Sequence, residues 1–476
     1  MLSDDWMAIY MGGTKIGHLH TEYIERSAPE GVLHVTRLVE QMSLKAGTAV
    51  LTIRVRQQIV EDADGRLVSF FHSMEQPGMS SPPTRGEVKD GRLSITTGQG
   101  PNAQRKAVEL PKGLCPQAFD RETQSRGFAP GTQYSLPVFL AESPEQAWTA
   151  SVEVVGKEAV PLFEVQKWLN RIEVKVSMLG ALNQVYWTDD EGEIWLVRVS
   201  MGTIDIEMRK VSREVALSSG GAADLMMRVA VRPDRPISNP RGRDSLTLLL
   251  KPTGKAPEDR TLPSDAFQEV TERADGLLVT VRKAVGDPSK SYTLPYGGEE
   301  WADLLEPTAW LESGDPLIVQ MSKEAVGGET DALKAAQRIE LYVRRVLAKK
   351  WLGMGFATAL ETARQRAGDC TEHAVLCAAL ARAAGIPSRV VMGMGYADAS
   401  SQFGAGQFLY HMWTEVYVGE WLPVDAAMLG HDATHIALGR SNLDSPGAMV
   451  EVSGPAMAFL GSTAIQVVEP GSPAQP

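Results

Sequence analysis

The chain has 476 residues, of which 43% are hydrophobic and 22% charged, values that are ordinary for a soluble globular protein. Its length exceeds that of one typical core and predicts several domains. The net charge is −12 without a basic block, so we expect neither nucleic acid nor an anionic membrane surface as a partner. No apolar run reaches the ~18 residues of a membrane-spanning helix, so we expect no transmembrane segment.

The cysteines and the N-terminus bear on the redox state and location of the protein. The three cysteines, Cys115, Cys370 and Cys377, stand at unrelated spacings, so we expect free thiols rather than a disulfide framework. Residues 1–5 lack a basic stretch followed by an apolar one, so no export signal is visible. Strand-like sequence that begins as early as Trp6 is also expected of a chain whose export signal has been removed, so two locations stay open. The protein is either exported or periplasmic, with the signal absent from this chain, or cytoplasmic.

Residues 1–219 are predicted to form one large antiparallel β domain. Their strand-like segments alternate apolar and polar residues and are separated by Gly, Pro and Asp turns. Gly12 and Gly13 separate the first two segments and predict a tight hairpin. The alternation is typical of a sheet with one buried face.

Beyond this domain the pattern changes twice. Ser218-Ser-Gly-Gly221 is a turn-rich break that predicts a domain boundary. Short strand-like segments with Pro-rich connections then predict a small β domain over residues 222–298. From residue 301 apolar residues recur at three- and four-residue steps, which predicts helices and an α+β domain over residues 301–440. Residues 441–476 are expected to hold a C-terminal strand and a disordered tail. The expected fold class is therefore α+β, multidomain, with β domains first.

Cys370 has the strongest chemical context in the chain. It follows Gly368 and Asp369 and enters a segment that is apolar nearly all round, which predicts a buried helix. Free N–H groups and the positive dipole end of a helix start are expected to lower the thiol pKa and to stabilise an oxyanion. A free cysteine is more often a small buried hydrophobe, which is our interpretation of Cys377 and Cys115.

A cysteine nucleophile needs a base, and His411 at the start of a predicted strand is the best candidate. Asp425, at the end of the next strand, is expected to hold the far N–H of the imidazole and to fix its tautomer. Their separation is even, so the two side chains share a face only if the turn near Gly419 has an odd number of residues or a bulge. We predict such a turn, because a two-residue hairpin would break the triad.

Other residues near these three are candidates for supporting roles. Trp351 is a candidate oxyanion donor by position, although a core role is at least as frequent for tryptophan. His373 would pack beside the thiol along the helix, and Trp413 would shield the base from water. His431 and His435 have the i, i+4 spacing of metal ligands. Because no third ligand is evident, we interpret them as part of a solvated loop or helix face and predict no metal site.

Four motifs that occur in order resemble the core of the bacterial transglutaminase-like family, within the papain-like superfamily. They are Gly368-Asp-Cys-Thr-Glu-His-Ala374, Ala383-Ala-Gly-Ile-Pro-Ser-Arg389, His411-Met-Trp-Thr-Glu-Val-Tyr417 and Trp421-Leu-Pro-Val-Asp425. The resemblance covers about residues 301–429. It implies an α+β core with the cysteine on a central helix and an antiparallel sheet bearing the histidine and aspartate. Carried over to this chain, the triad is Cys370, His411 and Asp425. The family commonly follows its aspartate with Pro-Thr, whereas Ala426-Ala427 stand here, so we expect a freer backbone at that point.

The expected function is cysteine-dependent acyl transfer or hydrolysis at an amide bond of a protein or peptide substrate. A thioester intermediate resolved by water gives a peptidase, amidase or deamidase, and one resolved by a lysine-like amine gives a transglutaminase. Hydrolysis is slightly favoured because no feature of the sequence identifies an amine pocket. No metal or organic cofactor is required. The alternative is a catalytically silent scaffold whose β domains bind a partner, and the sequence leaves the oligomeric state open.

Overall fold

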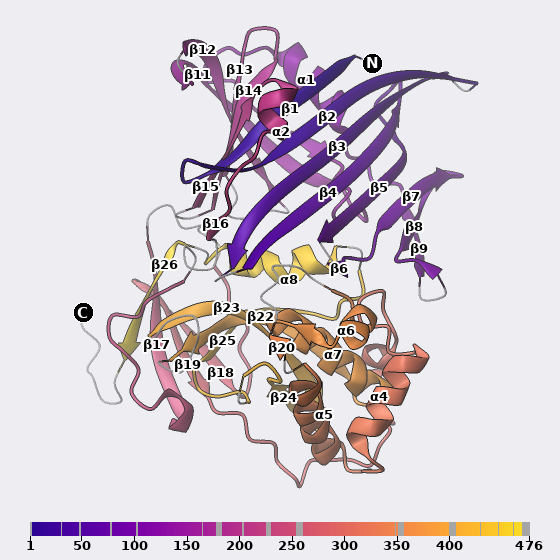
Figure 1. The fold of residues 1–476 in the computed structure, drawn as a ribbon, viewed down its shortest axis with the longest axis vertical. Coiled ribbons are helices and arrows are strands. Elements are labelled where there is room, and N and C mark those ends of the chain that lie inside the picture. Colours follow the sequence, from indigo (N-terminus) through magenta and orange to yellow (C-terminus); the bar gives the residue numbers. More distant parts are fainter. Residues whose placement is uncertain are drawn as a thin grey trace. The chain divides into compact units, whose positions relative to one another are not determined.

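The structure of the chain is a computed structural model that divides into two compact units, Met1–Leu225 and Met226–Pro476. It describes residues 2–468 except 30, 47–48, 77–78, 101–102, 164, 178–182, 202–203, 225–229, 254–259, 348, 351–356, 399–405, 429, 446 and 460. The first unit is built mainly of strands, and the second combines helices and sheets (Figure 1). The predicted order of an antiparallel β part followed by an α+β part is confirmed. The finer division of residues 222–476 stays a prediction.

The first unit contains one 16-stranded sheet in which sequential strands pair antiparallel. Its path is β10-β11-β12-β13-β14-β15-β1-β2-β3-β4-β5-β7-β8-β9, with β6 on β5 and β16 parallel to β3. The strands are β1 (Ser3–Met11), β2 (Thr14–Ala28), β3 (Gly31–Ala46), β4 (Ala49–Asp62), β5 (Leu67–Gln76), β6 (Met79–Ser80), β7 (Thr84–Lys89), β8 (Arg92–Thr97), β9 (Gln104–Glu109), β10 (Gln133–Val138), β11 (Trp148–Leu162), β12 (Val165–Val176), β13 (Asn183–Thr188), β14 (Ile194–Met201), β15 (Ile204–Lys210) and β16 (Ala223–Asp224). Two helices accompany them, α1 (Pro116–Arg126) and α2 (Arg213–Leu217).

The first hairpin of this sheet forms where the sequence predicts it. Met11 pairs with Thr14 across the turn, and the two glycines between them have φ angles of 55° and 79°. Positive φ at both positions is the requirement of the tight turn that matches strand twist, and glycine meets it without strain. The Gly12-Gly13 prediction is therefore confirmed.

The second unit places its helices and strands around one core. Its strands are β17 (Ser245–Pro252), β18 (Gln268–Arg273), β19 (Gly276–Arg282), β20 (Lys349–Lys350), β21 (Ala367–Gly368), β22 (Ser388–Ala397), β23 (Gln407–Tyr417), β24 (Trp421–Val424), β25 (His435–Ser441) and β26 (Thr463–Val468). Its α-helices are α4 (Pro316–Val326), α5 (Ala332–Val346), α6 (Ala359–Gln365), α7 (Cys370–Ala383) and α8 (Ala448–Met457), with short 3-10 helices η3 (Pro240–Gly242) and η4 (Ala302–Leu305). Two four-stranded sheets follow the orders β18-β19-β17-β26 and β24-β23-β22-β25, and β20 pairs with β21.

Helix α7 lies in the middle of this core, as its apolar sequence predicts. Every residue from Ala374 to Ala381 is at most 2% exposed. The helix packs on β23, where the Thr414 hydroxyl donates to the Ala374 carbonyl at 2.9 Å. Leu248 of β17 and Val279 of β19 belong to the same hydrophobic cluster as α7. The strands of the predicted small β domain thus share their core with the helices that follow.

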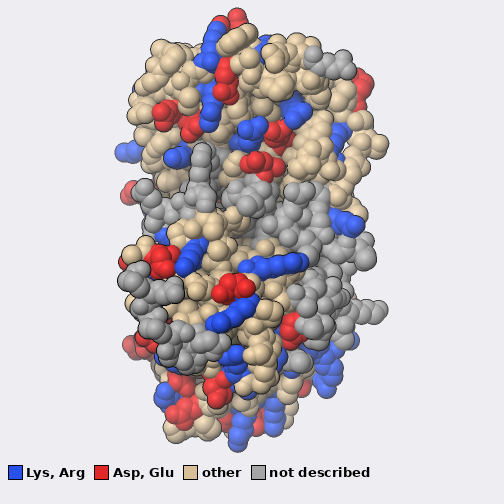
Figure 2. Space-filling model, turned by 90° about the vertical axis from the view of Figure 1, so that its left-hand side faces the viewer, with Lys and Arg blue, Asp and Glu red and all other residues tan. Residues whose placement is uncertain are grey.

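One face of the protein carries side chains of both charges. On the face shown in Figure 2, lysine and arginine side chains alternate with aspartate and glutamate over the described residues, without a broad area of one sign. Among the helices of the described residues, none has the length and apolar character needed to cross a membrane.

A buried carboxylate ties three strands of the second unit together. Glu415 on β23 is 4% exposed and accepts hydrogen bonds from Arg389 Nε at 2.7 Å and Arg440 Nε at 2.9 Å. Replacing Glu415 with glutamine leaves both guanidinium groups next to a neutral amide. We expect Glu415→Gln to lower the free energy of unfolding by about 3 kcal/mol, measured by urea denaturation. Glu420→Gln, which weakens an ion pair with the half-exposed Lys290 and keeps an acceptor for the Asp287 N–H, is the control, with an expected loss below about 1 kcal/mol. Equal losses in the two variants would contradict this account.

Candidate active site

The sequence around Cys370 is a helix-start signal. Asp369 caps α7 by accepting the Thr371 N–H at 2.9 Å, and Glu372 accepts the Asp369 N–H at 2.9 Å in return. Such a reciprocal capping box fixes the first turn of a helix. A Cβ atom at Gly368 would lie 2.3 Å from the Glu372 Cβ, so this cap requires glycine there. The motif therefore places Cys370 at the first helical position, as predicted.

The surroundings of the three cysteines differ. Cys115 and Cys377 are 0% and 1% exposed, whereas Cys370 keeps partial exposure. The Cys370 sulfur accepts a hydrogen bond from the backbone N–H of Met412 on β23. Met412 directly follows His411, so the thiol lies beside the strand that carries the candidate base. Burial raises the pKa of the Cys377 thiol to about 12, which suits the predicted packing role.

The expectation that the helix start lowers the Cys370 pKa is wrong. Burial raises the pKa of this thiol well above its ordinary value, and the neighbouring carboxyl groups of Asp369 and Glu372 raise it further. The hydrogen bond from the Met412 N–H lowers the Cys370 pKa, but not enough to cancel the rise. The main physical reason is burial, which disfavours any thiolate, and the acidic cap of this helix start further offsets the dipole that would stabilise one. The resting sulfur is therefore a thiol, and its reaction as a nucleophile requires a base.

The turn between β23 and β24 has the odd length that the sequence predicts. Tyr417 pairs with Trp421, which leaves three residues in the connection, and Gly419 has a φ of 98°. This register puts His411 and Asp425 on one face as a diagonal pair. Their side chains meet with 2.7 Å between His411 Nε2 and Asp425 Oδ2, and the two residues are 8% and 1% exposed.

Asp425 accepts hydrogen bonds on both of its oxygens. His411 Nε2 and His435 Nε2 lie 2.7 and 3.0 Å from Oδ2, while the backbone N–H groups of Ala427 and Met428 donate to Oδ1 at 2.8 and 3.1 Å. Burial alone would raise the Asp425 pKa, but the two histidines hold it well below its usual value. The ionised carboxylate assigns the proton of His411 to Nε2, which leaves Nδ1 as the basic nitrogen.

The backbone after Asp425 is held in place despite the change from the family pattern. The bonds from the Ala427 and Met428 N–H groups to Oδ1 form a turn closed by the aspartate side chain. The expectation of a freer backbone at Ala426-Ala427 is therefore wrong. The carboxylate itself supplies the restraint that proline would otherwise give.

His435 is a member of this site that the sequence interpretation missed. It begins β25, its side chain is 0% exposed, and its Nδ1 lies 3.3 Å from Asp432 Oδ1. Asp432 in turn pairs with Arg241 at 2.6 Å. Burial opposes a charge on His435, but the hydrogen bonds to Asp425 and Asp432 raise its pKa to about 9. His431 and His435 are 9% and 1% exposed, so their interpretation as a solvated face is wrong.

A signal for His435 was present in the sequence. The residues that follow it, Ile436-Ala-Leu438, have the apolar character of a buried strand rather than of a solvated helix face. A histidine at the start of such a strand, three residues after an aspartate, is placed to meet a carboxylate. Recognising the strand would have placed His435 in the core.

The remaining predicted residues have different placements. Trp413 is 2% exposed, and its ring centroid lies 6.0 Å from that of His411 and 5.4 Å from that of His435. It therefore covers both imidazoles, the position expected of a shield. His373 is 3% exposed and its Nδ1 lies 2.6 Å from the Asp369 carbonyl oxygen, one turn back on α7. Trp351 lies outside the described residues.

The cluster of His411, Asp425 and His435 also has the composition of a metal site. One ligand atom from each lies within 4.8 Å of the others, and all three residues are buried. Both imidazole Nε2 atoms, however, direct their hydrogen bonds at the same Asp425 oxygen. Because a metal would have to replace both protons, we interpret the cluster as a hydrogen-bond network.

The raised pKa of His435 predicts a pH dependence of stability. An ordinary histidine loses its proton near pH 6.5 in the unfolded chain, whereas folded His435 does so near 9. Its stabilisation is therefore fully present below pH 6.5 and is lost as the pH rises toward 9. We expect His435→Gln to remove a slope of up to about 1.4 kcal/mol per pH unit from the free energy of unfolding between pH 6.5 and about 8. His20→Gln, in the first unit, is the control. The free energy of unfolding is measured by urea denaturation at each pH, and the same pH dependence in wild type and His435→Gln would disprove the role given to His435.

The four motifs of this site lie within a stretch that a known family model matches. The model described as "Transglutaminase-like superfamily" matches residues 319–426, which include Cys370, His411 and Asp425. The search of curated proteins found no match to the chain.

Three solved structures are among those that are similar to this chain. A candidate cysteine protease from Cytophaga hutchinsonii is 16% identical, with 46% of this chain and 83% of that chain covered and a TM-score of 0.30. A β-barrel-like protein of a domain of unknown function from Brucella abortus is 15% identical, with 44% and 95% covered and a TM-score of 0.34. A candidate protease from Parabacteroides distasonis is 12% identical, with 78% and 69% covered and a TM-score of 0.20. The family match confirms the resemblance of the four motifs: residues 319–426 of this chain match the transglutaminase-like superfamily.

Proposed function

We propose that the second unit is a cysteine-dependent enzyme that breaks or transfers an amide bond, with Cys370 as nucleophile, His411 as base and Asp425 as the residue that orients the base. The observation that carries this proposal is the buried bond of 2.7 Å between His411 Nε2 and Asp425 Oδ2. It leaves His411 Nδ1 free to accept a proton. The neighbouring residue Met412 contacts the Cys370 sulfur through its N–H, so nucleophile and base belong to one site.

The first half of the reaction forms a thioester. His411 Nδ1 accepts the Cys370 proton as the sulfur attacks the amide carbonyl and a C–S bond forms. The carbonyl oxygen becomes an oxyanion, for which the Cys370 N–H is the proposed donor. The acidic cap at Asp369 already uses the N–H groups of Thr371 and Glu372, so they are less suited to this role. Protonated His411 then gives its proton to the amine nitrogen as the C–N bond breaks.

The second half of the reaction resolves the thioester. Water, deprotonated by His411, attacks the thioester carbonyl, the C–S bond breaks, and the Cys370 sulfur regains a proton from His411. The product is a carboxylic acid, the outcome of a peptidase, amidase or deamidase. A lysine-like amine gives a new amide, the outcome of a transglutaminase. We favour hydrolysis, because a buried site with a protein-derived base needs only water as the second reactant. A protein or peptide is the proposed substrate.

His435 is proposed as a positioning residue. Its Nε2 donates to the same Asp425 oxygen that His411 uses, at 3.0 Å, and its Nδ1 faces Asp432. With both nitrogens engaged, His435 holds the Asp425 carboxylate in the plane that His411 requires. It does not contact the reacting atoms in this proposal, so its removal affects rate far less than removal of Asp425.

Alkylation of the thiol tests the proposal without knowledge of the substrate. The full chain is treated with a chloroacetamide near neutral pH, and peptide mass spectrometry follows modification at each cysteine. Because a general base accelerates such a step about 10²-fold or more, we expect Cys370 in the wild type to react at least about 10² times faster than in His411→Ala. Buried Cys115 and Cys377 serve as internal controls, with slow labelling in both proteins. Slow and equal labelling of Cys370 would instead favour the catalytically silent scaffold.

A peptide screen then separates the possible reactions. Peptide mixtures are incubated with wild type and with Cys370→Ala, and mass spectrometry detects cleavage, deamidation or crosslinks. Products that depend on Cys370 identify the second reactant as water or an amine. If no product differs between the two proteins while Cys370 still reacts with the electrophile, amide substrates outside the screen become the next set to test.

A further inference from the structure

The first unit contains a large cavity along one face of its sheet. Its volume is about 980 Å³, at the upper end of the range for small-molecule sites. Alternate residues of neighbouring strands line it, for example Ile172, Val174 and Val176 of β12. Side chains of α1, including Gln117 and Asp120, complete the wall.

One side of the cavity is apolar. Strands β10, β11 and β12 and the segment after α1 supply this wall, which includes Val138, Ala150, Val152, Ile172, Val174 and Phe128. All but Phe128 belong to the buried part of a single hydrophobic cluster, and Phe128 packs against it. Such a surface favours a hydrocarbon chain, because each CH₂ group moved from water gains about 0.8 kcal/mol.

Polar groups gather on the side formed by β2, β13 and α1. The Tyr23 hydroxyl donates to Asp120 Oδ2 at 3.1 Å, and the Tyr186 hydroxyl donates to Gln184 Oε1 at 2.7 Å. Thr188 is 5% exposed, and its hydroxyl has no hydrogen-bond partner within the part of the chain that the structure describes. A buried hydroxyl without a partner is unfavourable, so it points to a ligand group that hydrogen-bonds there.

The charges in the cavity favour a cation. Its ionisable lining residues other than histidine and tyrosine are Asp5, Asp120, Glu191, Glu193, Arg121 and Lys210. Lys210 pairs with Asp5 and Glu193, each at 2.5 Å, and Arg121 pairs with Glu61 at 3.2 Å. Both cations thus have carboxylate partners other than Asp120, and the hydrogen bond that Asp120 accepts comes from the uncharged Tyr23, although the Arg121 charge also favours the ionised form of Asp120. Burial raises the pKa of Asp120 to about 6, so its carboxyl still ionises at neutral pH.

We propose that the first unit binds a long-chain amphiphile with a protonated amine head. The hydrocarbon chain lies against β10, β11 and β12, and the ammonium group donates to the Asp120 carboxylate. A carboxylate or phosphate head is disfavoured by the same acidic lining. The site is independent of the chemistry proposed for the second unit.

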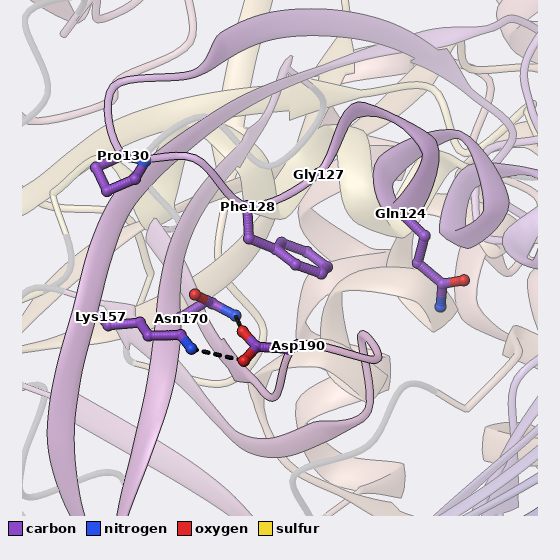
Figure 3. A pocket seen from close by; sticks show the side chains of 7 residues that line it. All are labelled: Gln124, Gly127, Phe128, Pro130, Lys157, Asn170 and Asp190. Atoms are coloured by element: carbon purple, nitrogen blue, oxygen red, sulfur yellow. Dashed lines mark hydrogen bonds and ion pairs between the residues drawn. The ribbon is translucent and has the colours of Figure 1, made fainter.

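A smaller pocket adjoins this cavity and supplies a control. Its volume is about 490 Å³, and Gln124 and Phe128 line both spaces. Figure 3 shows Lys157, Asn170 and Asp190 clustered within this pocket. Lys157 pairs with Asp190 at 2.6 Å, and the Asn170 amide donates to Asp190 at 3.2 Å. These groups satisfy one another, so we place the amine at Asp120 and not here.

Binding by the wild-type chain tests the chemical class of the ligand. Isothermal titration calorimetry at neutral pH, below the micelle concentration, compares hexylamine, octylamine and decylamine. We expect saturable binding whose affinity rises about fourfold for each added CH₂ group. Decanoate has as many carbon atoms as decylamine but a head group of the opposite charge. We expect it to bind at least about tenfold more weakly than decylamine. Absence of saturable binding, or equal affinity for the two head groups, would overturn the proposal.

Matched variants test the position of the head group. We expect Asp120→Asn, which keeps the shape and an acceptor for Tyr23, to weaken decylamine binding at least about tenfold while leaving decanol binding unchanged. Lys157→Ala in the adjoining pocket is expected to leave both affinities unchanged. If Asp120→Asn binds decylamine as tightly as the wild type, the site is not the one proposed. Neither measurement uses amide turnover, so a negative result leaves the proposed function of the second unit intact.

Discussion

Replacing Asp425 with asparagine is expected to lower kcat/KM for an amide substrate by about 10⁴-fold, the loss typical of a triad whose carboxylate is neutralised. Asp425 accepts four N–H groups, two on each oxygen. An asparagine has one oxygen, and its NH₂ group would face two donors. Either the histidines or the backbone turn at Ala427 and Met428 then loses its acceptor. In the first case His411 no longer keeps its proton on Nε2. In the second case the side chain at position 425 is no longer held in its orientation.

Single-turnover kinetics with a substrate from the peptide screen measure this effect. Asp432→Asn is the matched control, because Asp432 contacts His435 and, among the described residues, forms no hydrogen bond with His411. We expect its loss of rate to be less than about tenfold, as for a residue that acts through a second histidine. A rate for Asp425→Asn within tenfold of the wild type, or equal losses for the two variants, would disprove the assigned role of Asp425.

Replacing Gly419 with alanine is expected to destabilise the second unit and to disturb the triad. Gly419 has a φ of 98°, and an added Cβ would lie 1.9 Å from the carbonyl oxygen of Lys290. The backbone strain and the steric contact together predict a loss of about 3 kcal/mol in the free energy of unfolding. Because this glycine sets the odd turn that aligns β23 with β24, relief of the contact also shifts His411 relative to Asp425. Thermal or urea denaturation and the Cys370 alkylation rate measure the two effects.

Gly430 offers a matched control for this substitution. It has a similar φ of 95°, but the nearest atom to an added Cβ is Glu340 Oε1 at 3.6 Å, an ordinary contact. Gly430→Ala therefore introduces backbone strain without the collision, and we expect a loss of about 1 kcal/mol with little change in alkylation rate. Equal losses of stability in Gly419→Ala and Gly430→Ala would show that the Lys290 contact does not matter.

Local sequence was sufficient to predict several parts of the fold and of the candidate site. Gly12-Gly13 predicted its hairpin because positive φ at two successive residues favours glycine. The apolar run after Cys370 predicted a buried helix, because a helix without a polar face has no stable place at the surface. The even spacing of His411 and Asp425 predicted an odd turn at Gly419, because strand side chains alternate between faces.

Other features depended on groups that are distant in the sequence. His435 joined the site through a bond to Asp425, and its flanking residues gave only the pattern of a buried strand. The rise in the Cys370 pKa reflects burial by several elements together with the acidic cap, and the motif alone suggested a fall. The cavity of the first unit is lined by residues from Leu2 to Lys210, so no single stretch indicated it.

The sequence by itself determined which residues could form a nucleophile, a base and an orienting carboxylate, and it determined the local backbone that presents each one. Capping, periodicity and turn parity act over a few residues, so they can be read along the chain. Only the tertiary structure decided the protonation of Cys370, the second histidine on Asp425 and the polarity of the cavity around Asp120. Desolvation and charge interactions depend on distances between atoms, and folding sets those distances between residues far apart in the sequence.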